Sequence, residues 1–392
     1  MYNTIKDSRF AHPSTIGEME RRRAAVMQTL KQNEIDCIIL YNYDNFLGGY
    51  TRYFTDYPVG NYPTTVFFHR DGDVVVVGHG APDATSVPPF AKLPWMHTPA
   101  TPLMPTLLYT DNFAPKMILD EVKRRGCKRI GFIAMSMVPA ALYNYIREHM
   151  PGAELIDATD MVDRIKAIKS SEEIEGLLEA VRLHDCIASA VPAFFRPGKY
   201  EYEIVSDLKK VAADLHCEGL NIGLAADPVR PTMLPAPAQF RRVEPGDKLA
   251  CLVEVSGPGG YYGEVARLWS LGDPGPELAE AMKVSADCQK MIAGMVKPGA
   301  DPAELFRANN EFLTERGYAP EGRLFAHGQG FDMVERPAFS PAETMKLEEN
   351  MFLAIHPSAV NEKVFALCCD NYLVTADGAK RITKTPMEII IC

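Results

Sequence analysis

A short segment that occurs twice limits the folds open to this sequence more than any other feature does. Residues 195–198 are FRPG and residues 296–299 are VKPG, and a glutamate, Glu203 or Glu304, follows five residues after each glycine. In both copies a helix is expected before the basic residue and another after the Pro-Gly turn. Two such units about a hundred residues apart predict one domain of two related halves, each with helices outside and a sheet inside.

The first part of the sequence has a different pattern, in which helical apolar spacing alternates with short apolar runs. Helices are expected at 19–32, 112–125 and 140–149, and strands at 37–41, 64–68, 74–78 and 129–133. Ser170 and Glu173 form a capping box, which predicts a long helix to about residue 193. We therefore expect two domains, 1–162 and 163–392, with the helix at the join.

Composition excludes several classes of partner. The 392 residues are 47% hydrophobic, which is enough for two cores, and the net charge of −10 repels phosphate backbones. No apolar run is long enough to span a bilayer, and the N-terminus has no apolar signal core. The nine cysteines include no CxxC pair, which favours free thiols in a reducing compartment. We expect a cytoplasmic protein with no nucleic-acid or membrane partner.

Two glutamates are expected to face each other across a hairpin. A GPGG turn at 257–260 separates two apolar runs, and Glu254 and Glu264 lie almost equally far from it. Because side chains alternate between the faces of a strand, Ser256 and Tyr262 should share the face of the glutamates. Two carboxylates among apolar residues repel each other, so a cation, a shared proton or a basic substrate must offset their charge.

A second hairpin is predicted around residues 361–363. His356 and Cys369 lie almost equally far from its turn, and they could be a ligand pair or a thiol with its base. Between the two hairpins lies the segment HGQG at 327–330, which begins with His327. Its Gly-x-Gly frame suits close approach of the backbone to a ligand.

The order of these motifs resembles the family of creatinase and the methionine and proline-specific aminopeptidases. The resemblance covers nearly the whole chain, and the segments that carry it are 166–173, 245–247 (PGD), 327–330 and 373–378 (LVTADG). The resemblance implies an α/β (α+β) protein, with an N-terminal creatinase-like domain and a C-terminal pita-bread domain of two related halves with a curved antiparallel sheet. It also implies a homodimer, for which the aromatic-rich segment 41–57 is a candidate interface.

The sequence departs from this family at the positions that hold metal. Its peptidases bind two metal ions through Asp, Asp, His, Glu and Glu, and only the histidine is retained here. The matching residues are Glu254, Glu264, His327, His356 and Cys369. The histidine of the family's "HE.P" motif is Val334, and the catalytic histidine of creatinase-like proteins has no counterpart in 233–237.

These departures favour a hydrolase of a C–N bond in a small-molecule metabolite, similar to creatinase or ectoine hydrolase, with no metal and no aminopeptidase activity. One of two adjacent carboxylates can hold a proton while the other acts, and histidines exchange protons near neutral pH. The expected catalytic residues are Glu254, Glu264, His327 and His356, and the expected substrate-binding residues are Tyr262, Glu335, Arg336 and Cys369.

Two alternatives remain open. In the first, Glu264, His327, His356 and Cys369 hold one zinc or iron ion, which supports hydrolysis or a lyase reaction on a small substrate. In the second, the domain is a binding module without catalysis. Such modules usually replace the polar cluster by apolar or bulky residues, whereas the replacements here remain ionisable.

Overall fold

The computed structural model describes residues 12–42, 49–58, 62–80, 93–101 and 112–392, so the polar N-terminus and part of the aromatic-rich segment lie outside the described residues. The chain divides into two compact units, Met1–Lys166 and Ala167–Cys392. In the ranges given above, no helix combines the length and the apolar character needed to cross a membrane.

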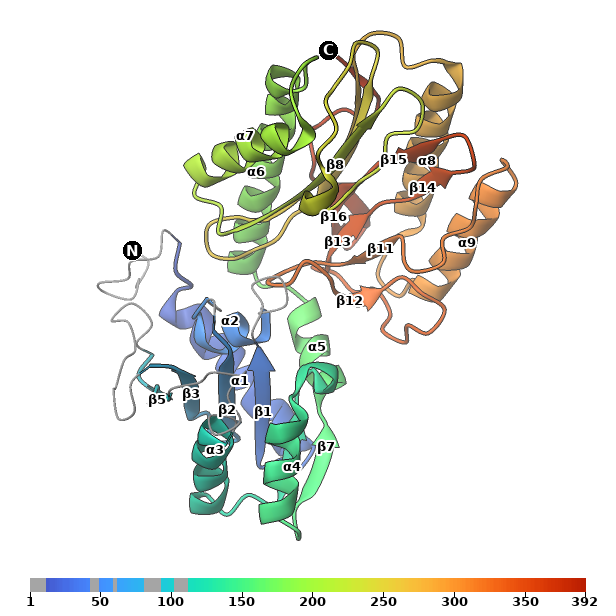
Figure 1. Ribbon diagram of the computed structural model, residues 1–392. Helices are drawn as coiled ribbons and strands as arrows, with labels where there is room; N and C mark the ends of the chain where they lie inside the picture. Colours follow the sequence, from blue (N-terminus) through green and yellow to red (C-terminus); the bar gives the residue numbers. More distant parts are fainter. Residues whose placement is uncertain (1–11, 43–48, 59–61, 81–92, 102–111) are drawn as a thin grey trace. The chain divides into compact units, whose positions relative to one another are not determined.

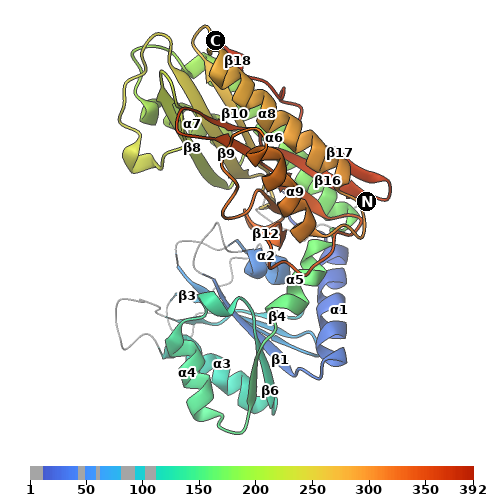
Figure 2. The same cartoon turned by 90° about the vertical axis from the view of Figure 1, so that its right-hand side faces the viewer.

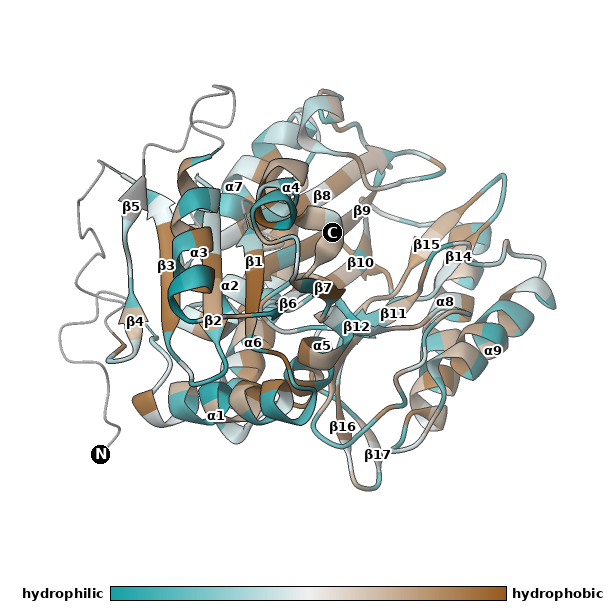
Figure 3. Ribbon diagram, turned by 90° about the horizontal axis from the view of Figure 1, so that it is seen from below, coloured by the Kyte–Doolittle hydropathy of each residue, from teal (hydrophilic) through white to brown (hydrophobic). Residues whose placement is uncertain are grey.

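The N-terminal unit contains a mixed sheet with the strand order β4-β3-β2-β1-β6-β7, and β5 pairs with β3 (Figure 1). The strands are β1 (Cys37–Asn42), β2 (Thr64–His69), β3 (Val74–His79), β4 (Met96–His97), β5 (Ala100–Thr101), β6 (Arg129–Phe132) and β7 (Glu154–Asp157). The helices are α1 (Ile16–Gln32), α2 (Gly49–Thr55), α3 (Phe113–Arg124), α4 (Ala140–His149) and α5 (Thr159–Ala167). The apolar colours of β1, β2 and β3 in Figure 3 match their fully buried side chains, such as Ile39 and Phe67. The predicted hairpin is present, because Phe67 pairs with Val75.

The C-terminal unit contains two larger sheets and a two-stranded ribbon. The strand orders of the sheets are β18-β10-β9-β8 and β12-β11-β13-β16-β17, and β14 pairs with β15. A bridge between Ala266 and Cys369 joins the two sheets, with backbone hydrogen bonds of 3.2 and 3.4 Å. The strands of the first sheet are β8 (Gly219–Asp227), β9 (Lys248–Ser256), β10 (Val265–Ser270) and β18 (Ile390–Ile391). Those of the second sheet and the ribbon are β11 (Ala326–Gly328), β12 (Glu335–Ala338), β13 (Phe352–Ile355), β14 (Ser358–Val360), β15 (Phe365–Leu367), β16 (Asp370–Thr375) and β17 (Gly378–Arg381).

Two helix pairs cover these sheets, one pair for each half (Figures 1 and 2). They are α6 (Ser171–Phe194) with α7 (Glu201–Asp214), and α8 (Pro276–Met295) with α9 (Pro302–Thr314). The capping box predicted at the start of α6 is present. The two Pro-Gly turns have the same geometry: Gly198 and Gly299 have φ angles of +92° and +86°. Their N–H groups donate to Val243 at 2.9 Å and to Leu347 at 2.7 Å, so the repeated segment does mark two related halves.

Strand β9 shows how this packing positions the functional face. Its odd-numbered residues from Leu249 to Val255 are fully buried, and they pack in one core with Ile187 and its neighbours on α6. Because side chains alternate along a strand, Glu254 points to the opposite face, away from α6. The confirmed fold is therefore the expected mixed α/β arrangement, with Glu254 on the face of β9 opposite α6.

Candidate active site

The first hairpin brings the two glutamates together as predicted. Val265 pairs with Val253 and Tyr262 pairs with Ser256, and this register places Glu264 directly opposite Glu254. The side-chain amide of Asn221, on the neighbouring strand β8, donates to Glu254 Oε2 at 2.9 Å.

The second hairpin has the corresponding register. Ile355 pairs with Asp370 and Ser358 pairs with Leu367, so His356 lies opposite Cys369. Cys369 in turn bridges to Ala266, two residues from Glu264, which brings the two predicted pairs into one cluster.

Three residues of this cluster form a candidate metal-ligand group: Glu264, His327 and His356. One ligand atom from each lies within 4.8 Å of the other two. Glu264 Oε2 is 3.3 Å from His327 Nε2, and the two imidazole rings are 5.2 Å apart between centroids. His327 reaches this position from β11, whose pairing with β13 sets it opposite Ala354. A carboxylate and two imidazoles converging in this way are a donor set that divalent metals accept.

The backbone contact of His327 fixes which ring nitrogen faces Glu264. Its Nδ1 lies 2.9 Å from the carbonyl oxygen of Gly328, which can only accept, so Nδ1 carries the hydrogen. Burial would lower the pKa of His327, but the hydrogen bond with Glu264 and the charge of that carboxylate raise it, so Nε2 can hold a proton that it donates to Glu264. A divalent ion bound by Glu264 and His327 would take the place of this proton, so the 3.3 Å pair is compatible with a metal site.

The pKa shifts follow from burial and from the mutual charge of the cluster. Burial would raise the pKa of Glu264, but the neighbouring His356 and His327 and the hydrogen bonds it accepts lower this pKa to about 2. Burial and the charge of Glu264 raise the pKa of Glu254 to about 8. Burial lowers the pKa of His356 to about 4, so near neutral pH its ring is unprotonated and can bind a metal.

Two amide side chains that the sequence analysis did not identify hold Glu264 in place. Gln329 Nε2 donates to Glu264 Oε2 at 3.3 Å, and Asn371 Oδ1 accepts the backbone N–H of Glu264 at 2.8 Å. Asn371 Nδ2 also donates to Gln329 Oε1 at 2.5 Å. Gln329 is the variable residue of HGQG, so the sequence offered only its place beside His327 as a signal.

His184 is a further buried residue that the sequence analysis missed. Its Nε2 accepts the N–H of Val255 at 3.1 Å, and its Nδ1 lies 2.7 Å from the carbonyl oxygen of Ala180. One ring nitrogen must accept and the other must donate, and burial lowers the pKa of this histidine, so the ring is neutral. It fixes α6 to β9 beside Glu254.

The remaining expected substrate-binding residues have contacts of other kinds. Tyr262 is buried on the face of the glutamates, and its backbone N–H donates to Gly330 at 2.8 Å. Glu335 forms a buried ion pair with Lys169 at 2.7 Å. Arg336 Nε lies 3.1 Å from Glu343 Oε2, in an ion pair that also involves the backbone of the following turn. Lys169 and Glu343, the partners of Glu335 and Arg336 in these ion pairs, lie outside the ligand group.

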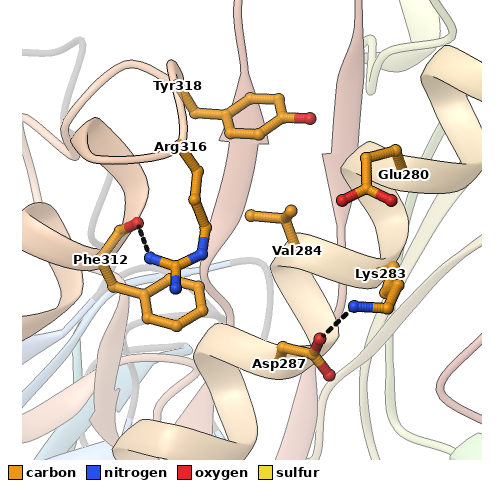
Figure 4. A pocket seen from close by; sticks show the side chains of 7 residues that line it. All are labelled: Glu280, Lys283, Val284, Asp287, Phe312, Arg316 and Tyr318. Atoms are coloured by element: carbon orange, nitrogen blue, oxygen red, sulfur yellow. Dashed lines mark hydrogen bonds and ion pairs between the residues drawn. The ribbon is translucent and has the colours of Figure 1, made fainter.

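A separate pocket lies between α8 and α9, with a volume of about 240 Å³ (Figure 4). Its lining residues are Glu280, Lys283, Val284, Asp287, Phe312, Arg316 and Tyr318, and none belongs to the ligand group. Lys283 pairs with Asp287 at 2.9 Å, and Arg316 Nη1 donates to the carbonyl oxygen of Phe312 at 2.8 Å. Among the described residues, the group that could hold a metal ion lies elsewhere, at Glu264, His327 and His356.

The fold and the ligand group define the class of protein. Residues 175–376 match the model of metallopeptidase family M24, and residues 22–168 match that of the creatinase/prolidase N-terminal domain. The chain belongs to the metallopeptidase family M24, a family of hydrolytic enzymes, and the resemblance drawn from the motifs is confirmed.

Among relatives, the chain is 27% identical over 275 residues to "Uncharacterized peptidase YqhT" of Bacillus subtilis, covering 69% of this chain and 77% of the relative. It is 26% identical over 251 residues to the Xaa-Pro dipeptidase of Pyrococcus furiosus, covering 59% of this chain and 67% of the relative. Among solved structures, the X-Pro aminopeptidase of Thermotoga maritima superposes with a TM-score of 0.79 at 19% identity, covering 94% of this chain and 99% of that one. The Xaa-Pro dipeptidase of Bacillus anthracis gives 0.76 at 19% identity, covering 95% and 100%.

Two expectations from the sequence are therefore wrong. The relatives are named as peptidases and Xaa-Pro dipeptidases, so a hydrolase restricted to non-peptide C–N bonds of small metabolites is not supported. The metal-free site is overturned as well, because the family is one of metallopeptidases and three ligands converge here. The error came from treating each altered ligand position as a loss, although His356 exchanges a carboxylate ligand for an imidazole ligand.

Proposed function

We propose that this protein is a metal-dependent hydrolase that cleaves the peptide bond of a short peptide. The observation that carries the proposal is the convergence of Glu264, His327 and His356 within 4.8 Å in a member of a metallopeptidase family. Relatives named Xaa-Pro dipeptidase make dipeptides that end in proline the first substrates to test.

The ligand group would hold a divalent ion, which would act as a Lewis acid on the carbonyl of the scissile bond. Glu264 provides the one carboxylate of the group, and its lowered pKa means that no proton has to leave it near neutral pH. His327 is oriented by Gly328 through Nδ1, which leaves Nε2 as the ligand atom.

Glu254 is the residue proposed for proton transfer. It lies opposite Glu264 in the hairpin but outside the ligand group, so it remains available to the substrate. Asn221 holds one of its oxygens at 2.9 Å, which fixes the direction of the carboxyl group. Its pKa of about 8 leaves a fraction of Glu254 ionised near neutral pH, and the ionised carboxylate can take a proton from the attacking water and pass it to the leaving amine.

The proposal is tested by removing and restoring metal. The purified chain is stripped with a chelator, reloaded separately with manganese, cobalt or zinc, and assayed on a panel of dipeptides with and without proline. We expect hydrolysis that returns only on reloading and that His327→Ala abolishes, whereas the exposed His149→Ala on α4 retains it. Absence of peptide hydrolysis with every metal would refute the proposal.

We further propose a homodimer, as the family resemblance suggested, and a location in the cytoplasm, as the composition suggested. Sedimentation at micromolar concentration tests the dimer, and a monomer there would contradict it.

A further inference from the structure

We infer that the thiol of Cys369 takes the place of a second metal ion on Glu264, so that the centre holds one ion and Cys369 is a positioning residue and not a ligand. The inference rests on the proposed function, since it concerns the same ligand group. It assigns a role to a residue for which the sequence left a ligand, a reactive thiol and a substrate contact open.

The two oxygens of Glu264 have different partners. Oε2 lies 3.3 Å from His327 Nε2 and accepts from Gln329 at 3.3 Å, on the side of the ligand group. Oε1 lies 3.1 Å from Cys369 Sγ. An ionised carboxylate can only accept hydrogen bonds, so the thiol donates. A carboxylate that bridges two metal ions needs both oxygens free, and here the thiol occupies one of them.

Cys369 is also fixed where it stands. Its backbone N–H and carbonyl both bond to Ala266, at 3.2 and 3.4 Å, and its side chain is fully buried. Its sulfur does not belong to the group of atoms that lie within 4.8 Å of one another. The sulfur of Cys369 donates to Oε1 of Glu264, and the backbone bonds to Ala266 hold the cysteine in place. It can therefore orient the metal ligand Glu264, as residues around metal ligands commonly do.

The residues that would have to bind a second metal ion are also unsuitable as its ligands. The other carboxyl group of the hairpin is that of Glu254, which lies outside the ligand group, and its Oε2 already accepts from Asn221 at 2.9 Å. The neighbouring donor at position 369 is a thiol where the peptidases of the family have a bridging glutamate. The geometry therefore supplies one complete ligand group and no second one among the described residues.

Cobalt(II) tests the inference without depending on activity. Wild-type protein, Cys369→Ser, Cys369→Ala and the control Cys368→Ala are titrated with cobalt, with stoichiometry measured by native mass spectrometry and coordination by absorption spectroscopy. Cys368 is an apt control because it is the adjacent buried cysteine, yet its sulfur faces Asp370 at 3.9 Å and not Glu264. Thermal unfolding of each variant checks its fold.

We expect one cobalt per chain and no sulfur-to-cobalt charge-transfer band in the wild type. Cys369→Ser keeps a donor and should retain the affinity, whereas Cys369→Ala should weaken it by about 10- to 100-fold. Cys368→Ala should match the wild type.

Three results would overturn the inference alone: a charge-transfer band that Cys369→Ser removes, two cobalt ions per wild-type chain, or an unchanged affinity in Cys369→Ala. A wild-type chain that binds no cobalt would overturn the proposed function together with it. If Cys369→Ala does not fold, the spectrum and stoichiometry of the wild type and of Cys369→Ser still decide between donor and ligand.

Discussion

The two hairpins of the C-terminal unit share a backbone plan but not a chemistry. In the first, Glu254 lies opposite Glu264, and in the second, His356 lies opposite Cys369 in the corresponding place. The first half thus contributes two carboxyl groups, whereas the second contributes an imidazole and a thiol. A repeated scaffold can therefore hold an asymmetric site, because the pairing register fixes where side chains lie and leaves their identity free.

The asymmetry is functional because neither half completes the site. Glu264 belongs to the first half, but the side chains that contact it come from the second half: His327, Gln329, Cys369 and Asn371. The bridge between Ala266 and Cys369 brings the halves together at this point. Changes in the first half should therefore separate metal binding from catalysis, and changes at the bridge should affect stability.

The largest effect is expected for Glu264→Gln, which removes the only carboxylate of the ligand group while keeping its shape. Metal binding and peptide hydrolysis should fall together by more than about 100-fold, since loss of a residue outside the ligand shell alone costs up to that much. Metal analysis and dipeptide hydrolysis measure the two losses. Glu277→Gln, at the exposed start of α8, is the control and should change neither. Full metal content in Glu264→Gln would contradict the assigned ligand group.

A substitution of Glu254, which lies opposite Glu264 in the hairpin, should affect catalysis and not metal binding. Glu254→Gln should leave one metal per chain and lower kcat by about 10²- to 10⁴-fold, the range that general acid–base residues contribute. Metal analysis next to steady-state kinetics separates the two outcomes. If Glu254→Gln loses metal as Glu264→Gln does, both glutamates are ligands and the distinction within the first hairpin is wrong.

The sequence allowed prediction of these two pairs because a hairpin turn fixes its own register. Residues at equal distance from a Gly-rich turn become neighbours, and this local rule gave Glu254 with Glu264 and His356 with Cys369. The capping box of α6 and the repeated Pro-Gly turns are also local, and all are present.

Contacts between distant segments could not be predicted in this way. Asn371 and Gln329 are 42 residues apart, and Glu264 and Asn371 are 107 residues apart, so no local spacing indicates their contact. Lys169 and Glu335 are 166 residues apart, so no pattern in the sequence indicates that Glu335 has a partner in an ion pair. The metal was misjudged for another reason: the one-ion alternative already grouped Glu264, His327 and His356, but the altered ligand positions were given more weight.

The next largest effect is expected on stability, from the buried ion pair of Arg267 and Asp370, the residues that follow Ala266 and Cys369 in the sequence. Arg267 of β10 and Asp370 of β16 are fully buried and 2.5 Å apart, and Arg381 Nε also donates to Asp370 at 3.1 Å. Asp370→Asn leaves the guanidinium of Arg267 buried without its anion and should lower the free energy of unfolding by about 3–5 kcal/mol. Urea unfolding measures this change. Asp287→Asn, in the surface pair with Lys283, should cost at most about 1 kcal/mol, and equal costs in the two variants would contradict the role of the buried pair.

The smallest effect tests whether the scaffold is as symmetric as its site is asymmetric. Gly198→Ala and Gly299→Ala each place a Cβ in open space, with no atom within 4 Å, so only the positive φ angle is strained. Each should lower the free energy of unfolding by about 1–2 kcal/mol, and by the same amount within error. Gly294→Ala is the control: its Cβ also meets nothing, but it lies inside α8 without a positive φ, and it should stabilise the protein by about 1 kcal/mol. Because neither turn glycine contacts the ligand group, kcat and metal content should not change in either variant. Unequal costs for Gly198→Ala and Gly299→Ala would show that the two halves differ in their turns as well as in their chemistry.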